Sequence, residues 1–173
     1  NTGNTTFIKN VQALNPSLIR FPGGSWGDIF FWNGKPNDVP DSVYNGTTGK
    51  KELFYAISGK NDWPTTTDNY YKLRQQTGSQ GLITINYGYA RYGLSEKPAE
   101  QAAHLAAQWV RYDKGRTKFW EIGNENGGPW EAGWMIDTKT NKDGQPQTIT
   151  GQLYGQHCSI FIDSMRAAAA EVG

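Results

Sequence analysis

The feature that most constrains the fold of this 173-residue chain is an alternation of helical and extended segments. Hydrophobic residues recur at helical spacing in some segments, and other segments are short aromatic or β-branched runs. The predicted helices cover residues 5–14, 66–76, 98–114 and 151–172, and the predicted strands cover residues 17–21, 81–86 and 118–124. Strands that alternate with helices form parallel sheets with helical crossovers. We therefore predict an α/β fold in one domain.

Two stretches interrupt this alternation. Residues 25–64 have no sustained period and are rich in turn formers, so they are predicted to form a long loop that can hold a short hairpin. Loops of this length in a compact domain usually have a function. The turn at residues 141–144 lies between two short apolar runs and predicts a second hairpin.

The most unusual residues come where the predicted strands end. The first strand ends in Pro22-Gly23-Gly24, the second in Asn86-Tyr87-Gly88, and the third in Asn124-Glu125 followed by further glycines. Parallel α/β folds build their sites at the carboxyl ends of strands. Neither the phosphate-loop pattern nor the dinucleotide fingerprint occurs, so these glycines are not predicted to bind phosphate.

The end of the third strand carries chemistry suited to sugars. An amide and a carboxyl group lie side by side at Asn124 and Glu125, and the next turn brings Trp130 and Trp134 over the same end. A carboxylic acid can protonate a glycosidic oxygen, an amide can bind a sugar hydroxyl, and an indole can stack on a sugar ring. The predicted partner is an oligosaccharide or polysaccharide.

Three motifs carry a resemblance to a known family. Arg20-Phe21-Pro22-Gly23-Gly24, Thr84-Ile85-Asn86-Tyr87-Gly88 and Trp120-Glu121-Ile122-Gly123-Asn124-Glu125 occur in this order with helices between them. Together they resemble the retaining glycoside hydrolases of clan A, most closely the family 51 α-L-arabinofuranosidases, over about residues 5–135.

The resemblance implies a fold and its missing parts. Family members are (β/α)₈ TIM barrels, and the three predicted strands would correspond to the second, third and fourth strands of that barrel. Residues 1–173 would then be one partial catalytic domain with the long loop 25–64. The remaining strands and the nucleophile would come from the rest of a parent chain.

The resemblance also implies site residues. Glu125 would be the catalytic acid/base, Asn124 would bind the sugar 2-hydroxyl, and Arg20 would be the active-site arginine of the second barrel strand. Ser25 stands where the family carries an asparagine, which removes an amide from the substrate pocket. Four more residues are candidates for substrate contact because of their place at strand ends and in the loops: Asn86, Tyr87, Trp26 and Trp130.

Several residues have a structural interpretation. Glu121 shares the strand parity of Glu125 but lies roughly 13 Å deeper, so we predict a structural ion pair with an arginine rather than catalysis. Arg20 is a candidate for this partner or for substrate binding. Core positions are predicted for Trp109, Trp120 and Cys158. The tryptophans of the loops could instead cover a small core of their own. The carboxylates of the nearby loops are expected to be solvated: Asp28, Glu131 and Asp137.

Composition excludes several classes of function. With 17 basic and 16 acidic residues, the net charge of +1 gives no reason to expect nucleic acid or a membrane surface as partner. The two histidines have no ligand at metal spacing, so neither a metal nor another cofactor is expected. Seven tryptophans, nine tyrosines and 21 glycines are typical of secreted carbohydrate-active proteins, so we expect an extracellular or periplasmic location. The start at Asn1 suggests a processed or truncated chain.

Other functions stay open. An endo-β-glycanase of the same clan, such as a cellulase, xyloglucanase or agarase, would share the Asn-Glu motif. A non-catalytic carbohydrate-binding domain would fit the aromatic content, although such modules are mostly β-sandwiches. A retaining mechanism needs two carboxyl groups about 5–5.5 Å apart. Since this chain offers no obvious second one, we expect it to be inactive alone.

Overall fold

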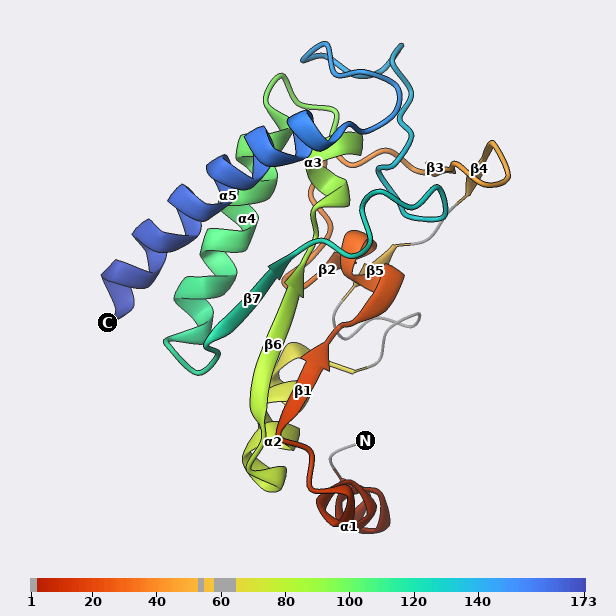
Figure 1. Ribbon diagram of the computed structural model, residues 1–173. Coiled ribbons are helices and arrows are strands. Elements are labelled where there is room, and N and C mark those ends of the chain that lie inside the picture. The colour runs from red at the N-terminus through yellow and green to blue at the C-terminus, as the bar shows by residue number, and fades with distance from the viewer. Residues whose placement is uncertain (1–2, 53–54, 58–64) are drawn as a thin grey trace.

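The computed structural model describes residues 3–52, 55–57 and 65–173. Its centre is a sheet of three parallel strands, β1 (Leu18–Phe21), β6 (Gln80–Ile85) and β7 (Phe119–Ile122), in the order β1-β6-β7 (Figure 1). Register pairs such as Phe21 with Ile83 and Thr84 with Glu121 align their carboxyl ends. The predicted parallel α/β arrangement is confirmed.

The four predicted helices are α1 (Thr5–Leu14), α2 (Thr67–Thr77), α4 (Pro98–Asp113) and α5 (Gly151–Val172). Local sequence explains their ends, because Thr66 caps α2 through the backbone N–H of Asn69 and Gly78 ends it in the left-handed region. A short helix that was not predicted, α3 (Gly88–Tyr92), follows β6. It begins where the Asn86 side chain accepts a hydrogen bond from the Tyr89 backbone.

The long loop is more structured than predicted. It holds a 3₁₀ helix, η1 (Gly24–Ile29), and β2 (Phe30–Phe31), which pairs in parallel with β5 (Ala56–Ile57). The short hairpin expected there is confirmed by β3 (Val43–Asn45) and β4 (Lys50–Glu52). Residues 53–54 and 58–64 of the predicted loop lie outside the described residues.

The second predicted hairpin is reduced to one antiparallel bridge between Met135 and Thr148. Backbone bonds from Ile136 to Gln147 and from Ile149 to Trp134 flank that bridge. The two arms therefore meet as predicted, but they do not form strands.

The two faces of the sheet have different surroundings. Helices α4 and α5 run side by side and, with α2, pack on one face, where Phe21, Ile83 and Trp109 are buried (Figure 1). Of the predicted core positions, Trp109 is buried, Trp120 is half-buried and packs against Trp109, and Cys158 is half-buried on α5. The opposite face carries exposed Leu18 and Phe119.

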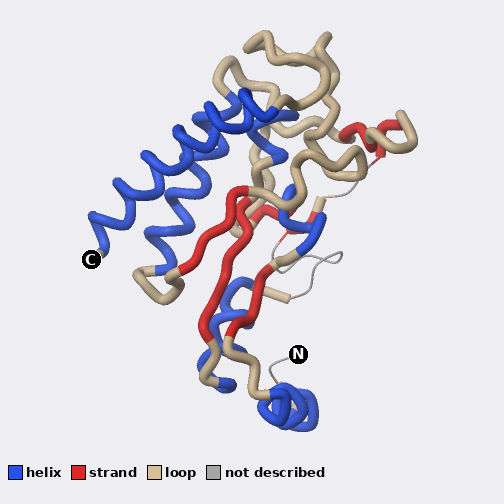
Figure 2. Tube along the Cα trace, in the orientation of Figure 1, coloured by secondary structure: helices blue, strands red, loops and turns tan. Residues whose placement is uncertain are grey.

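The loops after the strands gather at the carboxyl end of the sheet, together with α3 and the β3–β4 hairpin (Figure 2). This is the end at which the sequence placed its candidate site. No helix in the described part of the chain has the length and apolar character needed to cross a membrane.

Candidate active site

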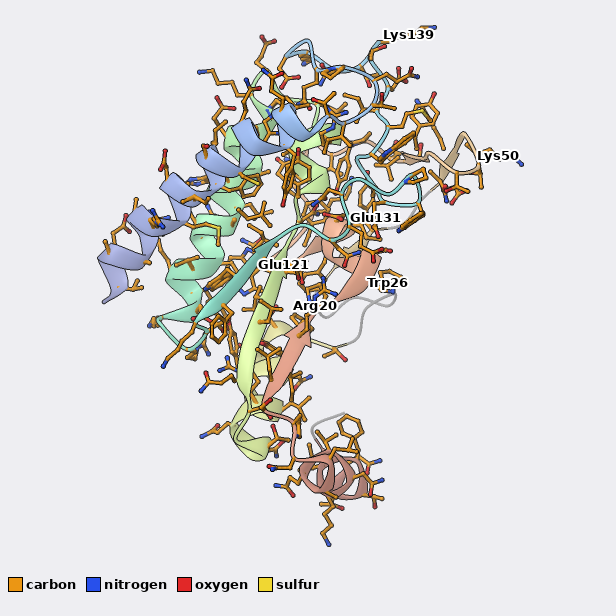
Figure 3. All side chains as sticks on the ribbon, viewed as in Figure 1. Arg20, Trp26, Lys50, Glu121, Glu131 and Lys139 are labelled. Carbon is orange, nitrogen blue, oxygen red and sulfur yellow. The ribbon has the colours of Figure 1, made fainter. Side chains whose placement is uncertain are left out.

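A polar network crosses the open face of the sheet near its carboxyl end. Arg20 of β1 is the partner in the ion pair predicted for Glu121 of β7, at 2.7 Å, and the Thr84 hydroxyl of β6 donates to the same Glu121 oxygen at 2.8 Å. All three strands therefore contribute one side chain to the network. Figure 3 shows Arg20 and Glu121 facing each other across the sheet, with Trp26 and Glu131 close to the same end.

Asn124 lies at the centre of this network and is 5 % exposed. Its Oδ1 accepts a hydrogen bond from Arg20 Nη2 at 2.7 Å, and its Nδ2 donates to Glu131 Oε1 at 2.8 Å. Its backbone N–H donates to Asp28 Oδ2 at 3.1 Å. Amide and backbone of Asn124 are thus fixed from three sides.

Glu125 comes next and points its carboxyl group outward. It is exposed, and it lines a hollow of about 340 Å³ that also contacts Trp134 and Tyr154. Trp130 donates its indole N–H to Glu125 Oε2 at 3.0 Å. The backbone of Glu125 has φ = 42°, a left-handed conformation that is uncommon for residues other than glycine and that concentrates at functional sites.

The loop after Glu125 folds back over the strand end through three successive turns. Backbone N–H groups of Gly128, Glu131 and Trp134 donate to the carbonyls of Glu125, Gly128 and Glu131, respectively. A side chain at position 128 would collide with the Trp130 ring at about 2.6 Å, so glycine lets the indole lie against the backbone. These turns bring Trp130 and Glu131 next to Glu125 and Asn124.

Two carboxylates expected to be solvated are buried, and that expectation was wrong for them. Asp28 in η1 accepts from the backbone of both Asn124 and Gly88, so it joins the segments that follow β7 and β6. Glu131 accepts at Oε1 from Asn124 and from the Ser25 hydroxyl at 2.7 Å. Burial raises the pKa of Asp28 well above its usual range and also raises the pKa of Glu131.

The third such carboxylate, Asp137, is half-buried and pairs with Lys51 at 2.7 Å. The hydrogen bond from Lys51 lowers the pKa of Asp137.

An aromatic hollow of about 210 Å³ lies beside Glu131. Trp26 and Trp130, 44 % and 55 % exposed, form part of its wall. The β3–β4 hairpin contributes Tyr44 and Asn45 to the far side, a contribution that the sequence did not predict. Among the residues that the structure describes, its lining is Ser25, Trp26, Ile29, Tyr44, Asn45, Trp130 and Ala132.

The structure does not bring Asn86 and Tyr87 to this surface. Asn86 is buried and bonds to the Phe30 carbonyl and the Tyr92 hydroxyl. The Tyr87 ring is buried against α5, with its hydroxyl 3.1 Å from Nδ1 of His157. Both side chains support the strand end from behind.

Within the described residues, no group of three or more His, Cys, Asp or Glu side chains could hold a metal ion. The expectation of a site without metal or other cofactor stays a prediction.

A solved sugar-cleaving enzyme shares this α/β fold. The chain superposes on an α-L-arabinofuranosidase of Thermotoga maritima, solved as an arabinose complex, with a TM-score of 0.55 and 20 % sequence identity. The superposition covers 94 % of this chain and 31 % of that chain. At this identity the likeness shows the α/β fold alone; the three strands of this sheet do not close a barrel within the described residues.

Sequence relatives point to the same class. An intracellular exo-α-(1→5)-L-arabinofuranosidase of Halalkalibacterium halodurans is 25 % identical over 140 residues, which is 73 % of this chain and 25 % of the relative. A "Probable alpha-L-arabinofuranosidase C" of Aspergillus terreus is 22 % identical over 138 residues, 74 % of this chain and 26 % of the relative. No family profile matches the chain.

The resemblance to the family 51 α-L-arabinofuranosidases is thereby confirmed. The chain spans about a quarter of the length of the curated relatives that it matches.

Proposed function

We propose that this chain is the part of a retaining, α-L-arabinofuranosidase-like glycoside hydrolase that carries the acid/base residue, Glu125. The substrate class is plant cell-wall or related polysaccharide. The observation that carries the proposal is the Asn124-Glu125 pair at the carboxyl end of a parallel strand, with Arg20 bonded to Asn124 at 2.7 Å. The similarity to arabinofuranosidases supports it.

Each residue has a role in this proposal. Glu125 is exposed and can protonate the leaving glycosidic oxygen, then accept a proton from the water that releases the sugar. Asn124 and Arg20 bind the sugar hydroxyls next to the cleaved bond. Trp26 and Trp130 stack on sugar rings, and Ser25 lines the same hollow. Asn86 and Tyr87 act only as supports.

The second catalytic carboxyl group is proposed to lie outside this chain. Asp28 and Glu131 are buried and cannot reach an anomeric carbon, and Glu121 is paired with Arg20. The other strands of a (β/α)₈ barrel would add the nucleophile and would cover exposed Leu18 and Phe119.

The test uses the full-length protein and an aryl α-L-arabinofuranoside. We expect Glu125→Gln to lower kcat by about 10²-fold or more, because the amide cannot transfer a proton. Glu96→Gln, a matched change at an exposed loop position, should leave kcat unchanged. Activity that survives in Glu125→Gln contradicts the role of Glu125.

A second arm tests the partial-barrel proposal. Residues 1–173 alone should show no turnover, since the described residues offer no second carboxyl group placed to act as nucleophile. Turnover by this chain that disappears in Glu125→Gln would instead show that both carboxyl groups are present.

Product analysis tests the substrate class. Release of arabinose from arabinan supports the arabinofuranosidase assignment, whereas cleavage of cellulose, xyloglucan or agarose supports the endo-β-glycanase alternative. The helical and parallel architecture differs from the β-sandwich of most carbohydrate-binding modules. Secretion is proposed from composition, although one relative is named as intracellular; fractionation of the source cells tests it.

A further inference from the structure

We propose that Glu131 is a positioning residue, whose buried carboxyl group holds the Asn124 amide in the one orientation that presents its N–H side to a sugar hydroxyl. The inference rests on the proposed function of Asn124-Glu125, and it assigns a role to a residue that the sequence placed among solvated carboxylates.

An asparagine amide can lie in two orientations that differ by exchange of its oxygen and nitrogen. Here Arg20 and Glu131 lie on the two sides of the Asn124 amide, one as a donor and the other as an acceptor. Arg20 can only donate, so the Asn124 atom that faces it at 2.7 Å must be the oxygen. Glu131 Oε1 also accepts from the Ser25 hydroxyl and so acts as an acceptor here, and the Asn124 atom that faces it at 2.8 Å must be the nitrogen. The reverse orientation would oppose donor to donor and acceptor to acceptor.

The orientation has a consequence for binding. One N–H of the Asn124 side chain donates to Glu131, and in this proposal the second N–H donates to a ligand oxygen. Without Glu131, only the hydrogen bond from Arg20 to the amide oxygen would restrain the planar amide, so the nitrogen would be held less firmly in its place. Glu131 therefore helps to orient the Asn124 N–H that donates to the sugar, although Glu131 itself does not contact the sugar.

Ser25 belongs to the same hydrogen-bond network as Glu131 and Asn124. Its hydroxyl donates to Glu131 Oε1 at 2.7 Å, so this oxygen receives hydrogen bonds from both Ser25 and Asn124. The resembling family carries an asparagine at the position of Ser25. In this chain the short hydroxyl reaches a carboxylate instead, and its effect on the sugar passes through Glu131 and Asn124.

Stability alone does not account for Glu131. Among the described residues, its second oxygen, Oε2, is buried without a hydrogen-bond partner. An unpaired buried acceptor costs free energy, and an apolar side chain of similar shape would avoid that cost. Glu131 lowers the stability of the fold but orients the Asn124 amide beside the proposed acid, which is what a functional constraint on this residue predicts.

The neighbouring residue strengthens this interpretation. Trp130 donates to the Glu125 carboxyl group, and Glu131 accepts from the Asn124 amide. Two consecutive loop residues thus hold both members of the Asn124-Glu125 pair. The turns that end at Gly128 and Glu131 fix the loop in this register.

The first experiment compares Glu131→Met, Glu131→Gln and the control Glu96→Met in the full-length enzyme. The substrates are an aryl α-L-arabinofuranoside and its 2-deoxy analogue. We divide kcat/KM for the hydroxyl-bearing substrate by kcat/KM for its 2-deoxy analogue. We expect Glu131→Met to lower this ratio about tenfold or more, because only the hydroxyl-bearing substrate loses a contact. Glu131→Gln keeps an acceptor oxygen and should preserve the ratio within about threefold. Equal losses on both substrates, or an unchanged ratio in Glu131→Met, overturn the proposal.

The second experiment needs no variant and so does not depend on the folding of Glu131→Met. In ¹⁵N- and ¹³C-labelled protein, the side-chain amide protons of Asn124 should shift with the titration of the Glu131 carboxyl carbon. Amide signals that do not respond to that titration overturn the proposal. If the wild-type protein cleaves neither substrate, the proposed hydrolase function fails, and this measurement separately decides whether Glu131 orients Asn124.

Discussion

The two faces of the β1-β6-β7 sheet use the same strands for different purposes. On the face covered by helices, Phe21, Ile83 and Trp109 are at most 7 % exposed and form one aromatic and aliphatic core. On the open face, Leu18 and Phe119 are 41 % and 51 % exposed, and Arg20 and Glu121 form an ion pair that is about one-third exposed.

The covered face of the sheet stabilises the fold, and the open face carries the residues of the proposed active site. The covered face buries the apolar area that holds the chain together. The open face and the strand ends above it carry the polar groups, and these are bonded to one another rather than to the core. Substitutions on the two faces should therefore have effects of very different size on the free energy of unfolding.

The largest effect is expected in the covered face. Trp109 contacts the rings of Phe21, Phe30 and Trp120, so Trp109→Ala leaves a large cavity. We expect a loss of about 3–5 kcal/mol in the free energy of unfolding, measured by denaturant titration. The control Trp26→Ala removes an indole that is 44 % exposed and should cost far less. Similar losses for the two variants would contradict the assignment of the core.

The next effect concerns the buried carboxyl group of Asp28, whose pKa is raised chiefly by burial. The Asp28 carboxyl group therefore stays protonated up to a higher pH in the folded state than in the unfolded state. Its contribution is therefore greatest below the unfolded pKa of about 3.9 and is lost as pH rises through the folded pKa. Relative to Asp28→Asn, wild-type stability should fall by up to about 1.4 kcal/mol per pH unit across that window.

Thermal unfolding of both proteins at a series of pH values checks this prediction. The matched control is Asp137→Asn, because the pKa of Asp137 is lowered by Lys51. Wild-type stability relative to that variant should instead rise with pH, since a lowered pKa favours the ionised folded state. A flat difference for Asp28 would show that its carboxyl group ionises in the folded protein as readily as in the unfolded chain.

The elements of the sheet could be predicted from sequence because their signals are local. Thr66, Gly78 and Pro98 mark helix ends through their own backbone chemistry, and the structure has α2 and α4 within one or two residues of prediction. Strand parity, a property of the backbone, also placed Glu121 on the face where it pairs with Arg20, which the sequence offered as a candidate partner.

The buried carboxylates could not be predicted in this way, because their burial depends on segments distant in sequence. Asp28 is covered where η1 meets the ends of β6 and β7. The apolar run Ile29-Phe30-Phe31 directly after it was the one available signal that this part of the loop is buried. Glu131 had no such signal, since its partners Ser25 and Asn124 meet it only after the 125–134 loop has folded back.

A smaller effect is expected for the ion pair of the open face. Glu121→Gln keeps the shape of the side chain but removes the charge that faces Arg20. Because both side chains are about one-third exposed, solvent screens the pair, and we expect a loss of about 1 kcal/mol or less in this chain. Denaturant titration at low and at high salt measures it. A loss as large as that of Trp109→Ala would show that the network, rather than the covered core, holds the strands together.

The smallest effect in the 173-residue chain is expected for Phe119→Thr. The ring is 51 % exposed, and threonine suits a strand, so stability should change by about 0.5 kcal/mol or less. The same substitution in the full-length protein distinguishes two origins of this exposed ring. If further barrel strands cover the open face, Phe119 becomes a core residue there, and the cost should rise to about 3 kcal/mol. A cost that stays near zero in the full-length protein would mean that the open face is a true surface, and the partial-barrel proposal would then be wrong.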